Sequence, residues 1–464
     1  IKVYPKKVDG LFRRLKWAAL VILLGIYYIV PWLRWDRGPG VPDQAVLFDF
    51  AGQRAYVLWI ETWPQEIYYL AGLLILAAIG LFFITSLFGR LWCGYACPQT
   101  VWTDLFMLVE RAIEGGRSAR IRLNKGPWTS AKVAKKIAKH TSWLVISFLT
   151  GGAWIMYFYD APTLIHDVVA FQVPTFAIFF VLMFTATTYL LGGISREQVC
   201  TYMCPWPRFQ SAMFDEDTMI VTYEKFRGEP RAPHKAGTSW EGRGDCIDCN
   251  QCVAACPTGI DIRDGSQLEC IGCGLCIDAC NTIMDRVDLP RGLIKFDTAA
   301  CQTALAENKP TTYRLVRPRT VLYAGLFVLV GCLMAYQLFT RPTFGVNLLR
   351  DRNPLFVKLS DGDIRNGYTL KILNMVRRSR DFTVTAQGVP GGIISRQEAG
   401  GSIIDEGSEM TVSAPPDQIA SYRLFIHAPQ SDLTSDATDL TLQVRSLEDE
   451  ESISHQTIFR GPSK

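Results

Sequence analysis

Charge and cysteine are both restricted in this sequence, and each restriction excludes a class of protein. Only 20% of the 464 residues are charged, 49% are hydrophobic, and the mean hydropathy is +0.13. So little charge excludes an ordinary soluble protein, and a net charge of +4 gives no basic surface for nucleic acid. None of the fourteen cysteines lies before Cys93 or after Cys332. The C-terminal part therefore has no disulfide framework.

Five uncharged runs are present instead, each long enough, or nearly so, for a helix that crosses a bilayer. A hydrocarbon core requires about 20 helical residues. The predicted spans are residues 17–33, 67–89, 141–159, 168–195 and 320–340. The first run is kept as a span because polar residues, Pro and Gly follow it without a small-residue cleavage site.

Lysine and arginine predict how these spans are oriented, because short loops rich in these residues stay in the cytoplasm. Residues 117–139 contain eight basic residues and no acidic one, and the N-terminal arm is also basic. The N terminus, 117–139 and 196–319 are therefore predicted to be cytoplasmic. Residues 34–66, 160–167 and everything after Arg341 are predicted to lie outside.

Eight cysteines form the strongest motif. Two runs, starting at Cys246 and Cys270, each have the spacing C-x2-C-x2-C-x3-C. In two-cluster ferredoxins, which these runs resemble, the fourth cysteine of each run binds the other cluster. One [4Fe-4S] cluster is thus assigned to Cys246, Cys249, Cys252 and Cys280, and a second to Cys256, Cys270, Cys273 and Cys276. Zinc sites are the alternative, but they use C-x2-C pairs separated by a longer spacer.

A second thiol motif, C-x-Y-x-C-P, occurs twice, as WCGYACP at Trp92–Pro98 and VCTYMCP at Val199–Pro205. The cysteines of each pair are four residues apart, so one helical turn would place both sulfurs on the same face. Each motif follows a predicted span at its cytoplasmic end, so the four thiols are expected to converge: Cys93, Cys97, Cys200 and Cys204. Soft sulfur ligands select Cu(I), zinc or an iron-sulfur cluster. Buried structural cysteines or a reversible dithiol are the alternatives, which the duplication disfavours.

Other polar residues are interpreted more simply. Arg90 and Arg196 precede the two motifs and are expected to favour thiolate over thiol. The lysine repeat of residues 132–139 is expected to lie on the anionic inner leaflet.

Two histidines and two cysteines remain. His140 and His166 bracket the third run, and a helix of that length separates them by about 28 Å. They cannot be the axial ligands of one haem in a single chain, and each is interpreted as an interface histidine. Cys301 has no assigned role, and Cys332 is interpreted as a small apolar residue in the fifth span.

The chain after Arg341 alternates polar and apolar residues in short segments separated by turns. These predict strands at Tyr368–Ile372, Phe382–Ala386, Met410–Ser413, Tyr422–Ile426 and Leu440–Val444. They predict an all-β sandwich of immunoglobulin type without its disulfide.

The expected fold is therefore multidomain. A polytopic α-helical membrane domain at 1–225 is followed by an inserted α+β ferredoxin module at 226–310. A fifth span at 311–341 then leads to the immunoglobulin-like domain at 342–464.

The spans carrying CGYACPQTVW and CTYMCPWPRF, the double cysteine run and the C-terminal sandwich resemble the CcoG/FixG/RdxA family of oxidase accessory proteins. The resemblance implies a bacterial inner-membrane oxidoreductase that reduces Cu(II) to Cu(I) for assembly of a cbb-type cytochrome c oxidase. The thiols matching that role are Cys93, Cys97, Cys200 and Cys204. Its expected partners are a cytosolic electron donor, copper-handling or oxidase assembly proteins bound by the outer domain, and membrane lipid; homo-oligomerisation stays open.

Three alternatives remain at this stage. The four thiols could hold a further iron-sulfur centre in place of copper. The chain could be a quinol-linked electron-transfer subunit, similar to the membrane polyferredoxins of nitrate and nitrous-oxide respiration. A non-redox assembly scaffold is the third reading, and it would keep its function after loss of every cluster ligand.

Overall fold

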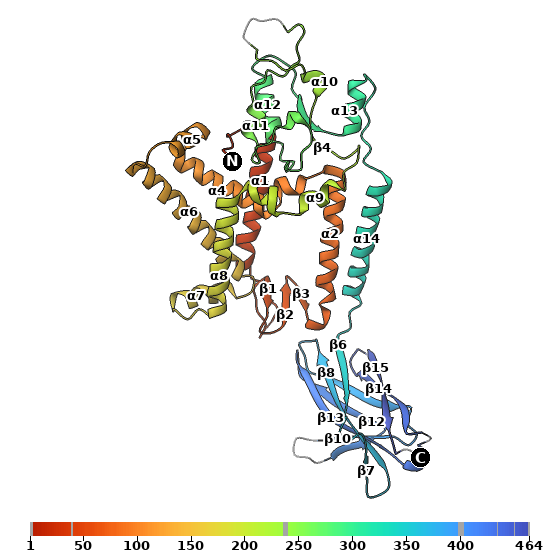
Figure 1. Ribbon diagram of the computed structural model, residues 1–464. Coiled ribbons are helices and arrows are strands. Elements are labelled where there is room, and N and C mark those ends of the chain that lie inside the picture. Colours follow the sequence, from red (N-terminus) through yellow and green to blue (C-terminus); the bar gives the residue numbers. More distant parts are fainter. Residues whose placement is uncertain are drawn as a thin grey trace. The chain divides into compact units, whose positions relative to one another are not determined.

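Long apolar helices dominate the first of two compact units in the computed structural model (Figure 1). The units are Ile1–Met334 and Ala335–Lys464. The structure describes residues 3–38, 40–234, 240–397, 403–433, 435–449 and 451–462. Among them, four helical segments are long and apolar enough to cross a membrane: Leu11–Trp32, Pro64–Phe88, Thr175–Ser195 and Pro318–Phe339.

These segments correspond to four of the predicted spans, with shifted ends. They comprise α1 (Leu11–Ile29) with the short helix Val30–Trp32, the turn Pro64–Glu66 with α2 (Tyr68–Phe88), α8 (Thr175–Thr188) with the π-helical turn Tyr189–Ser195, and α14 (Pro318–Phe339). The first helix begins earlier than expected because Arg13 and Lys16 of the basic arm are buried on it against Asp104.

The remaining predicted span, 141–159, overlaps α6 (Ser130–Ile155), which is longer and both starts and ends earlier. Its lysines lower its hydropathy, but they face the protein. Lys139 and Lys136 pair with Glu114 at 3.1 and 2.8 Å, and the Lys132 ammonium donates to the Gly126 carbonyl at 2.7 Å. The expectation that this repeat lies on the lipid leaflet is therefore wrong for these three residues, because buried carboxylates and carbonyls attract them inward.

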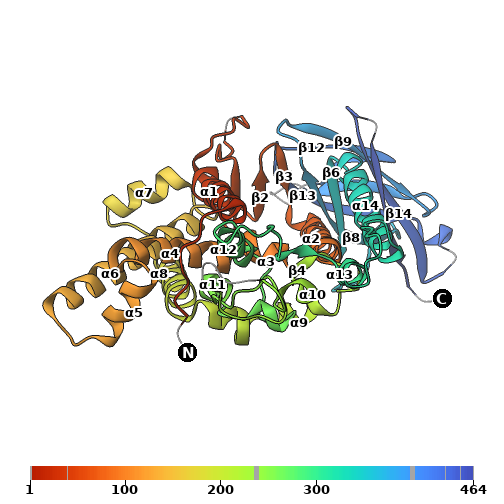
Figure 2. The same cartoon turned by 90° about the horizontal axis from the view of Figure 1, so that it is seen from above.

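Aromatic contacts pack the apolar helices against one another. Trp154 of α6 lies 5.3 Å from Phe184 of α8 between ring centroids. Tyr27 of α1 meets Trp102 of α4 (Pro98–Glu114) edge-on at 5.2 Å. Figures 1 and 2 both place α14 beside α2, and Phe82 contacts Tyr323 at 6.4 Å.

Several short elements were not foreseen. A small antiparallel sheet is formed by β1 (Val46–Asp49), β2 (Arg54–Val57) and β3 (Ile60–Thr62) within the first predicted outside loop. The helices α5 (Arg117–Lys125) and α7 (Ala161–Val169) join α4 to α6 and α6 to α8.

The inserted module is built from short helices around a two-stranded sheet. Helix α9 (Trp206–Ser211) precedes the module, whose elements are β4 (Ile220–Tyr223), α10 (Lys225–Gly228), α11 (Gln251–Ala255), the turn Ile262–Asp264, α12 (Leu275–Met284), β5 (Ile294–Asp297) and α13 (Ala299–Ala306). Strands β4 and β5 are antiparallel, with Val221 opposite Phe296. The chain before α1 and the first turn of α1 pack on this module, because Lys6 N–H donates to the Ala254 carbonyl at 2.7 Å and Arg13 N–H to Asp278 at 2.8 Å.

The second unit is an all-β domain of two antiparallel sheets. One has the order β11-β10-β13-β8-β6, with β7 pairing β8, and the other has the order β12-β9-β14-β15. The strands are β6 (Phe344–Arg350), β7 (Val357–Lys358), β8 (Ile364–Asn374), β9 (Arg380–Gln387), β10 (Ile393–Gln397), β11 (Ile403–Gly407), β12 (Glu409–Ala414), β13 (Ile419–Ala428), β14 (Ala437–Ser446) and β15 (Ser452–Arg460). All five predicted strands are present, in β8, β9, β12, β13 and β14. Alternate side chains from both sheets fill one core, with Leu370, Phe382 and Leu442 fully buried.

Candidate functional site

The eight cysteines of the two C-x2-C-x2-C-x3-C runs line two small cavities. Cys246, Cys249, Cys252 and Cys280 surround one of them, called here the Cys249 site. Cys256, Cys270, Cys273 and Cys276 surround the other, called here the Cys270 site, with Cys252 at its edge. In each site three cysteines come from one run and the fourth from the other run, as the ferredoxin pattern predicts.

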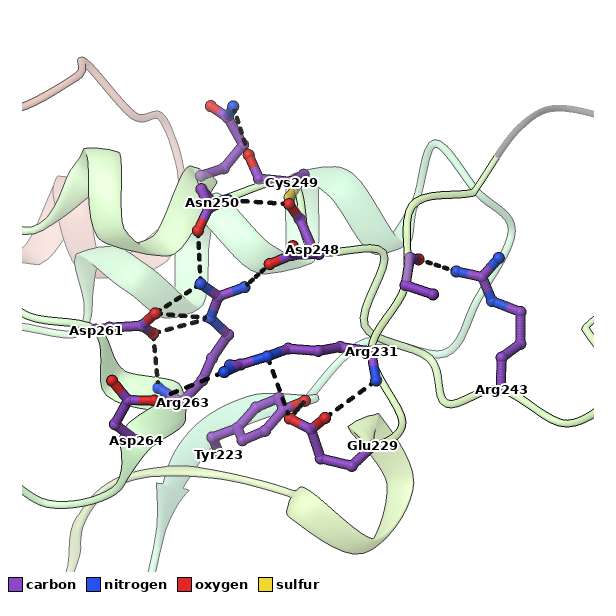
Figure 3. Close-up of polar contacts among 12 residues, drawn as sticks. Tyr223, Glu229, Arg231, Arg243, Asp248, Cys249, Asn250, Asp261, Arg263 and Asp264 are labelled. Atoms are coloured by element: carbon purple, nitrogen blue, oxygen red, sulfur yellow. Dashed lines mark hydrogen bonds and ion pairs between the residues drawn. The ribbon is translucent and has the colours of Figure 1, made fainter.

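The loop that carries Cys249 is braced by one buried arginine (Figure 3). The Arg263 guanidinium donates to Asp248 and Asn250, both at 2.6 Å, and also to Asp261. Asp248 and Asn250 both have φ near 53°, which is uncommon for non-glycine residues. Arg263 therefore fixes the turn on either side of Cys249, which is itself exposed.

The two C-x-Y-x-C-P motifs have a different local structure from the one predicted. Cys93 lies in the short helix α3 (Leu91–Tyr95), whereas Cys97 is extended and precedes the first turn of α4. Cys200 lies in a π-helical turn, Val199–Met203, and Cys204 is again extended. The pairs do not share one helical turn, because the residue before a proline is excluded from the helical region.

The four thiols nevertheless line one cavity of about 290 Å³, called here the four-thiol cavity. Cys93, Cys97, Cys200 and Cys204 all contribute to its wall, and so does Cys270 of the Cys270 site. The four-thiol cavity and the Cys270 site therefore share a residue.

Three polar side chains hold the first motif in place, and two of them tie it to segments beside the second motif. The Gln99 amide donates to the carbonyls of Leu191 and Arg196 at 2.8 and 3.1 Å, so the start of α4 is tied to the turn before the second motif. The Thr100 hydroxyl donates to the Cys93 carbonyl at 2.6 Å. Gln210 is fully buried, and its amide oxygen accepts a hydrogen bond from the Cys93 thiol at 3.2 Å. No sequence pattern indicated Gln210, since α9 brings it back to the motif from a distant position.

Burial controls the ionisation of the thiols more strongly than the neighbouring arginines do. Burial and the Cys97 thiol raise the pKa of Cys93 to about 12, against the opposing effect of Arg90. Burial also raises the pKa of Cys200 to about 11. Arg196 pairs with Glu110 at 2.9 Å and is not among the groups that shift the pKa of Cys200. The expectation that the arginines favour thiolate therefore holds in direction for Arg90 and is wrong for Arg196, and burial outweighs Arg90, so a bound metal must displace protons from these thiols.

The remaining candidate residues lie apart from these cavities. The His140 ring nitrogen Nδ1 hydrogen-bonds the Tyr189 hydroxyl at 2.8 Å, and His166 is an exposed residue beside Asp167. Cys301 is buried against the Thr312 carbonyl, and Cys332 is exposed on α14. None of these four residues lines the four-thiol cavity or either ferredoxin-type site.

The donor sets fit iron-sulfur clusters at the two ferredoxin-type sites. Each site offers four thiols around an enclosed space, and thiolates are the ligands of a [4Fe-4S] cube. Across the described ranges, no three His, Cys, Asp or Glu side chains are grouped so that they could hold a single metal ion. The cysteines of the two ferredoxin-type sites and of the four-thiol cavity line cavities instead, so a single metal ion in the four-thiol cavity requires its thiols to move closer together.

Protein-family models match three parts of the chain. A 4Fe-4S dicluster domain matches residues 195–299, and a 4Fe-4S binding domain matches residues 70–114. The model for the IG-like fold at the C-terminal of FixG matches residues 334–462. The first two matches contain all twelve cysteines of the four motifs.

Apolar helices and complete cysteine sets for two clusters define a membrane iron-sulfur electron-transfer protein. The chain is 46% identical to nitrogen fixation protein FixG of Rhizobium meliloti, over 92% of this chain and 87% of FixG. It is 47% identical to protein RdxB of Cereibacter sphaeroides, over 99% of this chain and 96% of RdxB, and 48% identical to RdxA of the same organism, over 95% and 93%. The chain belongs to the FixG/RdxA family.

Proposed function

We propose that the protein is a cupric reductase, which converts Cu(II) to Cu(I) for the copper centre of a cbb-type cytochrome c oxidase. The observation that carries the proposal is the four-thiol cavity, in which Cys93, Cys97, Cys200 and Cys204 share a wall with Cys270. A thiol site for a metal substrate therefore adjoins a site for an electron carrier.

The chemistry requires one electron per copper ion, and the only bonds broken in the protein are the S–H bonds of the thiols that bind copper. When bound at the Cys249 and Cys270 sites, [4Fe-4S] clusters supply one-electron carriers. A soluble one-electron reductant in the cytoplasm is the source of the electron, and Cu(II) is the acceptor. The thiols of the four-thiol cavity lose protons when copper binds, and their soft sulfur favours the Cu(I) product.

Five spans across a bacterial inner membrane fit this role. α6 is proposed as the fifth span because the lysines of its first half pair with Glu114, while exposed apolar residues follow at Leu144, Val145 and Phe148. The N terminus and the ferredoxin-type module are proposed to be cytoplasmic, and the C-terminal domain periplasmic. There the immunoglobulin-like domain would bind a copper-handling or oxidase assembly protein.

Metal analysis of the purified full-length protein tests the proposal. We expect about eight irons per chain, the content of two [4Fe-4S] clusters. We also expect added Cu(II) to be bound and then reduced by protein that has been reduced beforehand, as followed by loss of the Cu(II) EPR signal. An iron content of about twelve would instead assign a third cluster to the four-thiol cavity and remove copper from it.

A quinol-linked activity is the second candidate, and one observation favours it. An apolar cavity of about 640 Å³ lies between α1, α4, α6, α7 and α8, and its lining includes Tyr28, Trp32 and Leu105. Its volume lies in the range of ligand sites. If quinol is the electron source, adding a short-chain quinol without copper should reduce the iron-sulfur centres. An unchanged EPR spectrum after that addition would exclude this candidate.

A further inference from the structure

Arg90 occupies the junction between the first thiol motif and the inserted module. It precedes α3, and only 6% of its surface is exposed. Its guanidinium donates to the Cys270 carbonyl at 3.0 Å, to the Leu268 carbonyl, and to the Pro207 carbonyl at 2.7 Å. One side chain therefore connects three segments: the first motif, the loop of the Cys270 site and the start of α9 after the second motif.

The backbone of the first motif also packs directly on the Cys270 loop. Gly94 lies between Cys93 and Cys97, and a Cβ atom there would lie 2.9 Å from the Ile271 carbonyl oxygen and 3.1 Å from Cys273 Cα. The next residue, Tyr95, donates its hydroxyl to the Cys273 carbonyl at 3.0 Å. Only glycine fits at position 94 without separating the two loops.

Each of the two ferredoxin-type sites has its own arginine. The Arg90 guanidinium donates to the Cys270 carbonyl at 3.0 Å, so its positive charge lies beside the Cys270 site. At the Cys249 site, Arg263 has the corresponding position, because it donates to Asp248 and Asn250 on either side of Cys249, both at 2.6 Å. Of the residues that line the four-thiol cavity, Cys270 is from the Cys270 site and none is a cysteine of the Cys249 site.

We propose that Arg90 is the positioning residue that holds the Cys270 site against the four-thiol cavity. The Cys270 site, rather than the Cys249 site, is then the electron-exchange partner of that cavity. The Cys249 site, whose Cys249 is exposed, is left for the soluble reductant. The proposal rests on the proposed function in one respect: it treats the four-thiol cavity as the site that accepts the electron.

Two properties of arginine explain the role. Its planar fork reaches several carbonyls at once, which a lysine ammonium cannot reproduce. Its fixed positive charge beside Cys270 stabilises the more negative, reduced state of a group held there, and so raises that group's potential. Removing the positive charge should therefore lower the midpoint potential of the group at the Cys270 site alone. Removing the planar guanidinium should loosen the loop of residues 268–273.

The test uses the full-length protein with its iron centres and without copper, in the variants Arg90→Gln, Arg90→Lys and Arg263→Gln. Midpoint potentials are measured by EPR-monitored titration and iron by metal analysis. We expect Arg90→Gln to lower the potential of one centre, Arg263→Gln to lower that of the other, and Arg90→Lys to restore the first. If Arg90→Gln and Arg263→Gln shift the same centre, or Arg90→Gln shifts neither, the proposal is wrong.

Amide hydrogen exchange of residues 268–273 gives a readout that does not depend on bound iron. Exchange should rise in both Arg90 variants and stay at the wild-type level in Arg263→Gln. The exchange measurement remains decisive if Arg90→Gln loses iron. Unchanged exchange in Arg90→Lys would then overturn the positioning role.

Gly94→Ala separates distance from charge, since it leaves every charged group in place. Its Cβ must push the loops apart, so Cu(II) reduction should slow by about tenfold or more, while both potentials stay near their wild-type values. Wild-type-like reduction by Gly94→Ala would contradict the direct contact. Absence of Cu(II) reduction in the unmodified protein would refute the cupric reductase proposal instead. The midpoint potentials and the hydrogen exchange would still test the role of Arg90, because neither measurement involves copper.

Discussion

Replacing Cys93 and Cys97 together by serine should abolish Cu(II) reduction while leaving about eight irons per chain in place. Both residues line the four-thiol cavity and neither lines the Cys249 site. Loss of a residue that only supports a metal ligand already weakens binding 10- to 100-fold, so loss of two thiols should weaken copper binding by more than about 100-fold. Equilibrium binding of Cu(I) against a competing chelator measures this loss.

The matched control is Cys332→Ser. Cys332 is an exposed cysteine on α14 that lines neither the four-thiol cavity nor a ferredoxin-type site. It undergoes the same chemical change, so copper binding and iron content should match those of the wild type. Copper binding that survives in the double variant with its iron intact would show that copper is held elsewhere.

The second large effect is expected at Glu110, a fully buried carboxylate on α4. It lies 2.9 Å from both Arg120 and Arg196 and 3.7 Å from Lys139. Glu110→Gln keeps the shape but removes the charge that these three cations share. Breaking a buried ion pair by removing one partner costs about 3–5 kcal/mol, so the thermal unfolding midpoint in detergent should fall markedly.

Glu307→Gln is the control for this change. Glu307 pairs with Lys309 on the surface, where both side chains are more than half exposed. Such pairs contribute about 0–1 kcal/mol, so its midpoint should change little. Equal midpoints for the two variants would mean that the Glu110 cluster does not stabilise the fold.

The same cluster fixes the direction of its pH dependence. Although burial opposes it, Arg196, Arg120 and Lys139 hold the pKa of Glu110 at about 2, below its ordinary value of 4.5. Because the pKa in the folded protein is depressed, the stabilisation is complete above pH 4.5 and is lost as the pH falls toward 2. Glu110 should therefore add no pH dependence to stability under neutral conditions.

The cysteine sets could be predicted from the sequence because the spacing of the cysteines determines which of them can bind the same cluster. A C-x2-C-x2-C-x3-C run supplies three ligands of one cluster from its own loop, and the fourth ligand comes from the partner run. The two cavities are lined by these expected sets of cysteines. The convergence of Cys93 and Cys200 also followed from their equal position after two spans. Their conformation did not, because the prolines after Cys97 and Cys204 override the helical turn that spacing suggests.

The contacts that join the sites were beyond the sequence for a different reason. Arg90 and Gln210 act through neighbours more than one hundred residues away, and local periodicity carries no information about such pairs. The strands of the C-terminal domain were predictable where alternation is strict, as in β8. The edge strand β15 was missed although it also alternates.

The inward-facing lysines of α6 constrain how the membrane part is assembled. Lys136 and Lys139 are compatible with an apolar surrounding only while Glu110 and Glu114 are beside them. Without α4, Lys136 and Lys139 would lose these carboxylate partners. The two helices therefore fold as one pre-paired unit, and a truncation that ends the chain between them should leave α4 without the lysines that neutralise Glu114.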